Sequence, residues 1–137
     1  MIYRPAFIFS RLAAVVIDHL LLFVVMIMIY QHIFHGDINN IQLDMRLYIY
    51  FFLINFLYFF LFELFFQKTV GKKILNIQVI TIDHQKPKLL NIFLRNLLRP
   101  IDMIGFYLIG LIFIVFTPLD QRLGDIFGQT YVVNSLD

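Results

Sequence analysis

Two long apolar runs, separated by a short polar stretch, are the clearest pattern in the sequence. Residues 12–30 and residues 47–66 are each apolar at all but two positions, and the connection 31–46 between them is polar. A membrane-spanning helix needs about 20 mostly apolar residues to cross the hydrocarbon core of a bilayer. The two runs therefore predict two membrane-spanning helices, joined by a loop outside the membrane.

A third apolar region, residues 89–116, is divided by polar side chains. Its last part, residues 103–116, is an unbroken run of apolar residues and glycine that is short for a complete span. Pro100 breaks the helix upstream of this run, because proline has no amide hydrogen to donate. We expect either one further span over residues 101–117 or a bent, re-entrant pair of short helices.

The first part of this third region has the pattern of an amphipathic helix. Asn91, Arg95 and Arg99 recur at every fourth position, so they form one polar stripe on an otherwise apolar helix. A helix with this pattern suits the membrane interface, where one face meets lipid and the other meets water. We therefore expect an interfacial amphipathic helix before the third apolar run.

Two short segments have a strand pattern. Residues 75–82 alternate between apolar and polar, and residues 130–133 are the other strong β-run. Because a single strand is not stable alone, we expect the two segments to pair on one side of the membrane. Pairing requires the third apolar region to cross an even number of times or to re-enter. The predicted fold is an all-α polytopic membrane protein, a single domain over residues 1–137, with this small cytoplasmic β-pairing.

Composition strengthens the membrane assignment. The chain is 61% apolar and 15% charged, whereas soluble domains are nearer 45–50% apolar and about 25% charged. A small soluble domain cannot bury that much apolar surface, so we expect the lipid bilayer to cover it. The absence of cysteine excludes disulfides and thiol chemistry, and a net charge of +2 gives no reason to expect a nucleic-acid partner.

The basic residues are unevenly distributed. Seven of the 11 Lys and Arg residues lie in the segment 67–99, whereas the connection 31–46 has one Arg and two Asp. Because basic residues concentrate in cytoplasmic loops, we expect the N-terminus and the segment 67–99 to be cytoplasmic. The predicted location is the cell (inner) membrane, with more than one pass.

Charged residues within the apolar runs are the candidates for function. A carboxylate such as Asp18 at membrane depth costs about 2.5–3.5 kcal/mol to insert. Arg11 precedes it by nearly two helical turns, so the two side chains share one helix face with about 10 Å of rise between them. Arg95 and Asp102 repeat this spacing. These residues are candidates either for a cation or proton site or for a fixed charge network that holds helices together.

Other polar positions carry weaker signals. Glu63 ends the second run with Lys68 just beyond, so we expect its side chain to reach the membrane surface. Asn55, in the middle of that run, is expected to form a hydrogen bond between helices. The sequence has no H-E-x-x-H or G-x-G-x-x-G motif and no Ser/His/Asp constellation in a soluble domain. We therefore expect no enzyme, no cofactor and no metal.

Several short motifs together resemble a known family. They are Arg-Leu-Ala-Ala at 11–14 with Asp18, Thr-Val-Gly-Lys-Lys at 69–73, Leu-Arg-Asn-Leu-Leu-Arg at 94–99 and Gln-Arg-Leu-Gly-Asp at 121–125. In order and spacing the chain resembles the RDD family of membrane proteins, named for one Arg and two Asp. The resemblance places the Arg at Arg11 and the first Asp at Asp18. It places the second at Asp125, with Asp102 as a rival.

The resemblance implies a transport role, with cation/proton exchange in some members. We predict a small ion or solute transporter in which Asp18 binds the cation or proton, working as a homo-oligomer or within a membrane complex. The alternative is a non-transporting membrane subunit or scaffold. In that case the basic segment 67–99 docks a partner complex or anionic lipid.

Overall fold

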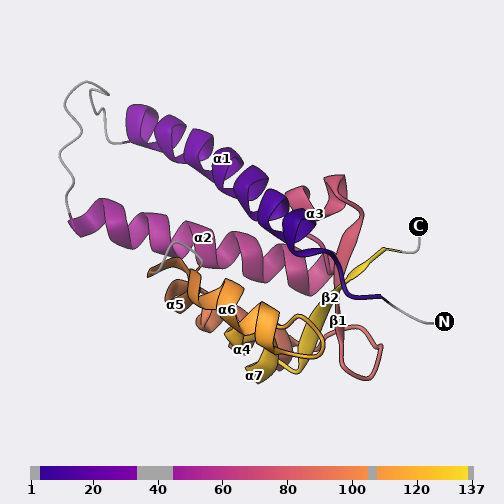
Figure 1. Ribbon diagram of the computed structural model, residues 1–137. Helices are drawn as coiled ribbons and strands as arrows, with labels where there is room; N and C mark the ends of the chain where they lie inside the picture. The colour runs from indigo at the N-terminus through magenta and orange to yellow at the C-terminus, as the bar shows by residue number, and fades with distance from the viewer. Residues whose placement is uncertain (1–3, 34–44, 105–107, 136–137) are drawn as a thin grey trace.

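Two long helices dominate the computed structural model, which describes residues 4–33, 45–104 and 108–135 (Figure 1). They are α1 (Ile8–Ile33) and α2 (Met45–Phe66). Within the described ranges, only these two helices are long and apolar enough to cross a membrane. Only 17% of each apolar window is buried inside the protein, so lipid is the solvent that suits the remainder. Both predicted runs lie in these helices, as expected.

A two-stranded antiparallel sheet lies at one end of the helix pair. β1 (Ile77–Thr81) pairs with β2 (Thr130–Asn134), with Ile77 opposite Asn134 and Thr81 opposite Thr130. The predicted β-pairing is confirmed. The amide of Asn134 also donates to the carbonyl of Arg4 (3.3 Å), so the described chain begins and ends beside the sheet.

Short helices fill the rest of the chain. α3 (Val70–Ile74) links α2 to β1 and packs on α1, and α7 (Leu123–Phe127) precedes β2 and packs on α4. Between the strands lie α4 (Leu89–Leu97), α5 (Arg99–Ile104) and α6 (Leu108–Phe116). Figure 1 shows α4 and α6 beside the half of α2 that is nearer the sheet, and α5 farther from the sheet along α2.

The strand pairing constrains the third apolar region. Because β1 and β2 lie side by side, the chain between them must leave and return to the same end of the protein. α5 and α6 contact each other and have only six and nine described residues, whereas a full span needs about 20. Neither of these two described helices alone has the length of a full span.

The amphipathic character of α4 is confirmed, but its orientation differs from the expectation. The polar stripe faces the protein: Arg95 and Arg99 are buried against other helices, and Asn91 donates to the carbonyl of Gly128 (3.0 Å). The apolar face points outward, with Leu89 and Leu90 60% and 65% exposed. The expected water-facing stripe is therefore wrong, because α2 and α7 supply polar partners that attract these side chains inward. An outward apolar face suits contact with lipid.

Candidate ion site and buried charge network

Asp18 is fully buried at the meeting point of α1, α2 and α3. Its Oδ1 accepts hydrogen bonds from the Tyr58 hydroxyl (2.7 Å) and the Gly71 amide (2.8 Å). Its Oδ2 accepts one from the Thr69 hydroxyl (2.5 Å). The Tyr58 hydroxyl in turn accepts from the amide of Val70 (3.2 Å). Three segments of the chain are thus tied together through one carboxylate.

The glycine at position 71 makes this arrangement possible. A Cβ atom there would overlap the backbone carbonyl of Ala14, so only glycine lets α3 approach α1 this closely. That approach brings the Gly71 amide within reach of Asp18. The Thr-Val-Gly segment of the sequence therefore serves the carboxylate directly, with Thr69 donating its hydroxyl and also capping α3 through the Lys72 amide (3.4 Å).

Glu63, near the end of α2, is the centre of a second arrangement. Its Oε1 pairs with Lys72 and with Arg99 Nη2 (3.2 Å), and its Oε2 accepts from Arg95 Nε (2.9 Å) and Asn96 Nδ2 (3.1 Å). The Glu63 side chain is completely buried. The expectation that it reaches the membrane surface is wrong, because α3, α4 and α5 each bring one cationic side chain to it.

Asp125, on α7, is the centre of a third group of contacts. It pairs with Arg11 Nη2 (2.7 Å), with Arg95 Nη1 and with Arg122 Nε (3.5 Å). Arg95 therefore touches both Glu63 and Asp125. Burial alone would raise the pKa of Asp125, but the charges of Arg95, Arg122 and Arg11 hold it well below its usual range.

These contacts join seven buried side chains, which we call the Glu63–Asp125 network: Arg11, Glu63, Lys72, Arg95, Arg99, Arg122 and Asp125. A second close approach between two helices, at Gly124, positions this network. A Cβ atom at Gly124 would overlap the carbonyl of Arg95, so glycine there lets α7 pack on α4. Burial lowers the pKa of Lys72 to about 7, although Glu63 raises it. The network holds α1, α2, α3, α4, α5 and α7 to one another.

The structure gathers most of the predicted site residues, in two groups. Arg11, Arg95 and Asp125 meet in the network, whereas the hydrogen bonds of Asp18 go to other residues. Arg11 turns instead to Asp125 and the carbonyl of Asp120. Arg11 and Asp18 therefore share one helix face but have different partners. The Asp102 side chain lies outside the described part of the structure, and Arg11 contacts Asp125.

Glu63 was missed as a network residue, although a signal was present. The polar stripe at positions 91, 95 and 99 carries two arginines through an apolar region, and such charges need a buried partner. Glu63 is the acidic residue of the second apolar run, residues 47–66, and it lies near the end of that run. Its position relative to α4 depends on tertiary packing, which the pattern of a single helix does not reveal.

Two further polar side chains of the spans have local partners. His19 Nδ1 lies 2.8 Å from the carbonyl of Val15, and its ring lies 5.7 Å from the ring of Phe59. Asn55 Nδ2 donates to the carbonyl of Phe51 in its own helix (3.0 Å), rather than across helices as expected. The buried Oδ1 of Asn55 has no hydrogen-bond partner among the described residues.

The buried carboxylates differ in what neutralises them. Glu63 and Asp125 are surrounded by Lys and Arg, whereas the hydrogen-bond partners that the described residues give Asp18 are neutral hydroxyl and amide groups. Within the described ranges, no group of three or more His, Asp or Glu side chains could hold a metal ion. Asp18, Tyr58 and Thr69 do place four oxygen atoms together, and oxygen atoms are the ligands that hard cations prefer.

Comparison with known sequences agrees with the motifs. The sequence profile of the RDD family matches residues 5–129, which is most of the chain. The match includes Gly71, Gly124 and all residues of the Glu63–Asp125 network. No match was found among curated proteins or solved structures.

Proposed function

Given that this chain belongs to the RDD family, we propose that it is a membrane protein that exchanges protons for a monovalent cation at Asp18. One observation carries the proposal. Asp18 is a fully buried carboxylate in a membrane-capable helix, and its described hydrogen-bond partners are all neutral. A buried carboxylate at membrane depth without a described cationic partner is a candidate site for an ion.

The same oxygen atoms serve both ligands. A bound cation is coordinated by the Asp18 carboxylate together with the hydroxyl oxygens of Tyr58 and Thr69, whose hydrogens then turn away from it. A bound proton instead neutralises the carboxylate. Because one carboxylate cannot hold both, cation and proton compete, and this competition is the basic requirement of an exchanger.

Occupancy of Asp18 also couples to the packing of α3. In the charged state the carboxylate accepts from Thr69 and from the Gly71 amide, which holds α3 against α1. Charge-assisted bonds of this kind weaken when the carboxylate is protonated. We propose that loosening of this contact opens Asp18 to one side of the membrane.

Orientation and assembly are parts of this proposal. The basic segment 67–99 favours a cytoplasmic position for the sheet end of the protein, in the cell membrane, and the strand pairing brings the C-terminal strand to that same side. Two spans enclose little space for a path, so the transporting unit is a homo-oligomer or a complex with other membrane proteins. The chemistry is ion exchange, with no enzymatic step.

The experiment is cation-driven proton movement in liposomes that contain the purified protein. A pH-sensitive dye inside the vesicles reports proton flux after a gradient of Na⁺, K⁺ or Li⁺ is applied. We expect flux with the natural protein and none with Asp18→Asn, which keeps the shape of the side chain and removes its charge. Asp83→Asn is the matched control, because Asp83 is exposed beside the sheet and should leave the flux unchanged.

Absence of flux from the natural protein with every monovalent cation overturns the proposal. Elution of Asp18→Asn from a size-exclusion column must match that of the natural protein, so that loss of flux is separated from loss of folding. Asp18→Asn protein that fails to accumulate points to a structural role for this carboxylate.

A second candidate function is a non-transporting membrane subunit or scaffold, and the Glu63–Asp125 network favours it. Its carboxylates are held by several cations each, and it connects six helices, as a rigid scaffold requires. The basic segment 67–99 then serves as the docking surface for a partner complex. A partner that copurifies in mild detergent, together with absence of flux, supports this candidate over the exchanger.

A further inference from the structure

The short helix α3 contacts two buried carboxylates, one on each membrane-capable helix. The Thr69 hydroxyl and the Gly71 amide donate to Asp18 on α1 (2.5 and 2.8 Å). The side chain of the next residue, Lys72, pairs with Glu63 on α2. Because Gly71 and Lys72 are adjacent in the chain, a movement of α3 changes both contacts at once. The surroundings of Asp18 are therefore coupled to the Glu63–Asp125 network through α3.

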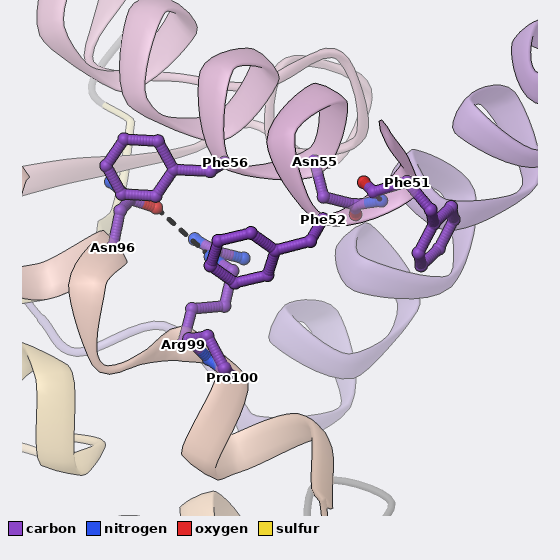
Figure 2. A pocket seen from close by; sticks show the side chains of 7 residues that line it. All are labelled: Phe51, Phe52, Asn55, Phe56, Asn96, Arg99 and Pro100. Carbon is purple, nitrogen blue, oxygen red and sulfur yellow. Dashed lines mark hydrogen bonds between the residues drawn. The ribbon is translucent and has the colours of Figure 1, made fainter. Parts of the chain in front are cut away.

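Glu63 gives α3 a fixed point of attachment. Its Oε2 accepts from Arg95 Nε (2.9 Å) and Asn96 Nδ2 (3.1 Å). Its Oε1 accepts from Arg99 Nη2 (3.2 Å). Figure 2 shows that Arg99 also donates to Asn96 (3.1 Å), so these two side chains hold each other in place at the α4–α5 junction. These contacts fix the Glu63 carboxylate independently of Lys72.

The contact between α3 and α1 tolerates little movement. A Cβ atom at Gly71 would overlap the carbonyl of Ala14, so the backbones of the two helices already touch. The bonds from Thr69 and Gly71 to Asp18 have ordinary lengths, and a shift of α3 by about 1 Å away from α1 would lengthen both beyond the usual range. The set of donors around Asp18 therefore depends on where α3 lies.

Lys72 ties α3 to the fixed carboxylate of Glu63. Lys72 is buried, with 6% of the residue exposed, so its ammonium group has little contact with water. A buried ammonium group is stable only beside a counter-charge and a hydrogen-bond acceptor, and Glu63 supplies both. Separation of Lys72 from Glu63 is therefore costly, which keeps α3 in one place. The next residue, Lys73, is exposed and lacks this constraint.

From these contacts we propose that Lys72 is a positioning residue for the Asp18 site. Its ion pair with Glu63 holds α3 at the distance from α1 at which Thr69 and Gly71 reach the Asp18 carboxylate. Lys72 acts through these two residues and does not touch the bound ion. Its role in ion binding rests on the exchange proposed at Asp18, whereas its role in holding α3 does not.

The substitution Lys72→Met tests this ion pair alone. Methionine keeps an unbranched side chain of similar length and removes the ammonium group. Glu63 keeps its contacts with Arg95 and Arg99, so no carboxylate loses its last counter-charge. The matched control is Lys73→Met, because it makes the same chemical change at the adjacent, exposed position.

Deuterium uptake, measured by mass spectrometry on the purified full-length chain in mild detergent, reports how often α3 leaves α1. The amides of Val70 and Gly71 donate to side chains of α2 and α1 only while α3 is in place. We expect uptake in residues 69–75 to be at least about tenfold faster in Lys72→Met than in the natural protein, and unchanged in Lys73→Met. Equal uptake in Lys72→Met and the natural protein overturns the proposal. So does an equal acceleration in β2, which would indicate a general loss of stability.

Proton flux in liposomes tests the effect on ion binding. In Lys72→Met the cation concentration that gives half-maximal flux should rise about tenfold, while the maximal flux should stay within about twofold of the natural value. The reason is that the Asp18 carboxylate remains and only its neighbours lose their position. Lys73→Met should leave both quantities unchanged. A lower maximal flux at an unchanged half-maximal concentration overturns the positioning role, since it would mean that Lys72 acts after the ion has bound.

The two measurements separate failure of this proposal from failure of the exchange function. Absence of flux from the natural protein with every monovalent cation overturns ion exchange at Asp18 and, with it, the role of Lys72 in ion binding. Deuterium uptake needs no flux, so it then decides alone whether Lys72 holds α3. Flux from the natural protein, together with equal uptake in Lys72→Met, keeps the exchange function and overturns the role of Lys72.

Discussion

Replacement of Glu63 by Gln tests the central role of this carboxylate in the fold. Glu63 accepts from Lys72 and Arg99 through one oxygen and from Arg95 and Asn96 through the other. Glutamine keeps the shape but has one acceptor oxygen, and its NH₂ group would face donors. The variant thus leaves three buried cations without their shared counter-charge.

The magnitude follows from the number of partners lost. Removing one partner of a buried ion pair costs about 3–5 kcal/mol, because the remaining charge stays buried and unpaired. Three cations share this carboxylate, so we expect a loss at the upper end of that range. The second variant Glu63→Gln with Lys72→Met removes one of the stranded cations, and it should recover part of the loss.

The assay is unfolding by SDS in mixed micelles, followed by far-ultraviolet circular dichroism. Natural protein, Glu63→Gln, the double variant and the exposed control Asp83→Asn are compared at one detergent concentration and pH. A loss below about 1 kcal/mol in Glu63→Gln, the range of an exposed ion pair, would refute the reasoning. So would a double variant that is less stable than the single one.

Three more predictions follow from the contacts around Asp18 and the network. Gly71→Ala forces α3 away from α1 and should lower the free energy of unfolding by at least about 1–3 kcal/mol, measured by the same SDS titration. Thr69→Val removes a donor to Asp18 and should cost about 1.5–3 kcal/mol, the worth of a hydrogen bond to a charged group; a loss no larger than in Asp83→Asn would contradict this. Burial lowers the pKa of Lys72 from 10.5 to about 7, so between these values the unfolded chain binds more protons than the folded one. The free energy of unfolding should therefore rise as the pH increases from 7 to 10, and this rise should be smaller in Lys72→Met.

The elements that depend on local pattern were predictable from the sequence. The apolar runs predicted α1 and α2, and alternation predicted that residues 75–82 form a strand, of which Ile77–Thr81 do. Strand pairing followed from the physical need of a strand for a partner. These predictions succeed because a membrane imposes length and polarity on helices, and a sheet imposes alternation on strands, before any tertiary contact forms.

The partners of the charged residues were not predictable in the same way. Helix geometry places Arg11 and Asp18 on one face, yet their partners come from α7 and α3, which lie far along the chain. The helix pattern also predicts a polar stripe at positions 91, 95 and 99, but it does not determine whether this stripe faces water or protein. That choice depends on Glu63 and Asp125, whose positions are set only when the helices pack.

Alternate binding of a proton and a cation at Asp18 is the claim most open to direct measurement. Infrared difference spectroscopy of the protein in lipid detects the C=O stretch of a protonated carboxylic acid, and this band disappears when the acid ionises. At a pH where Asp18 is protonated without salt, addition of the transported cation should remove one such band, and Asp18→Asn should lack it. A spectrum of the natural protein that is the same with the cation and with choline would contradict the proposal.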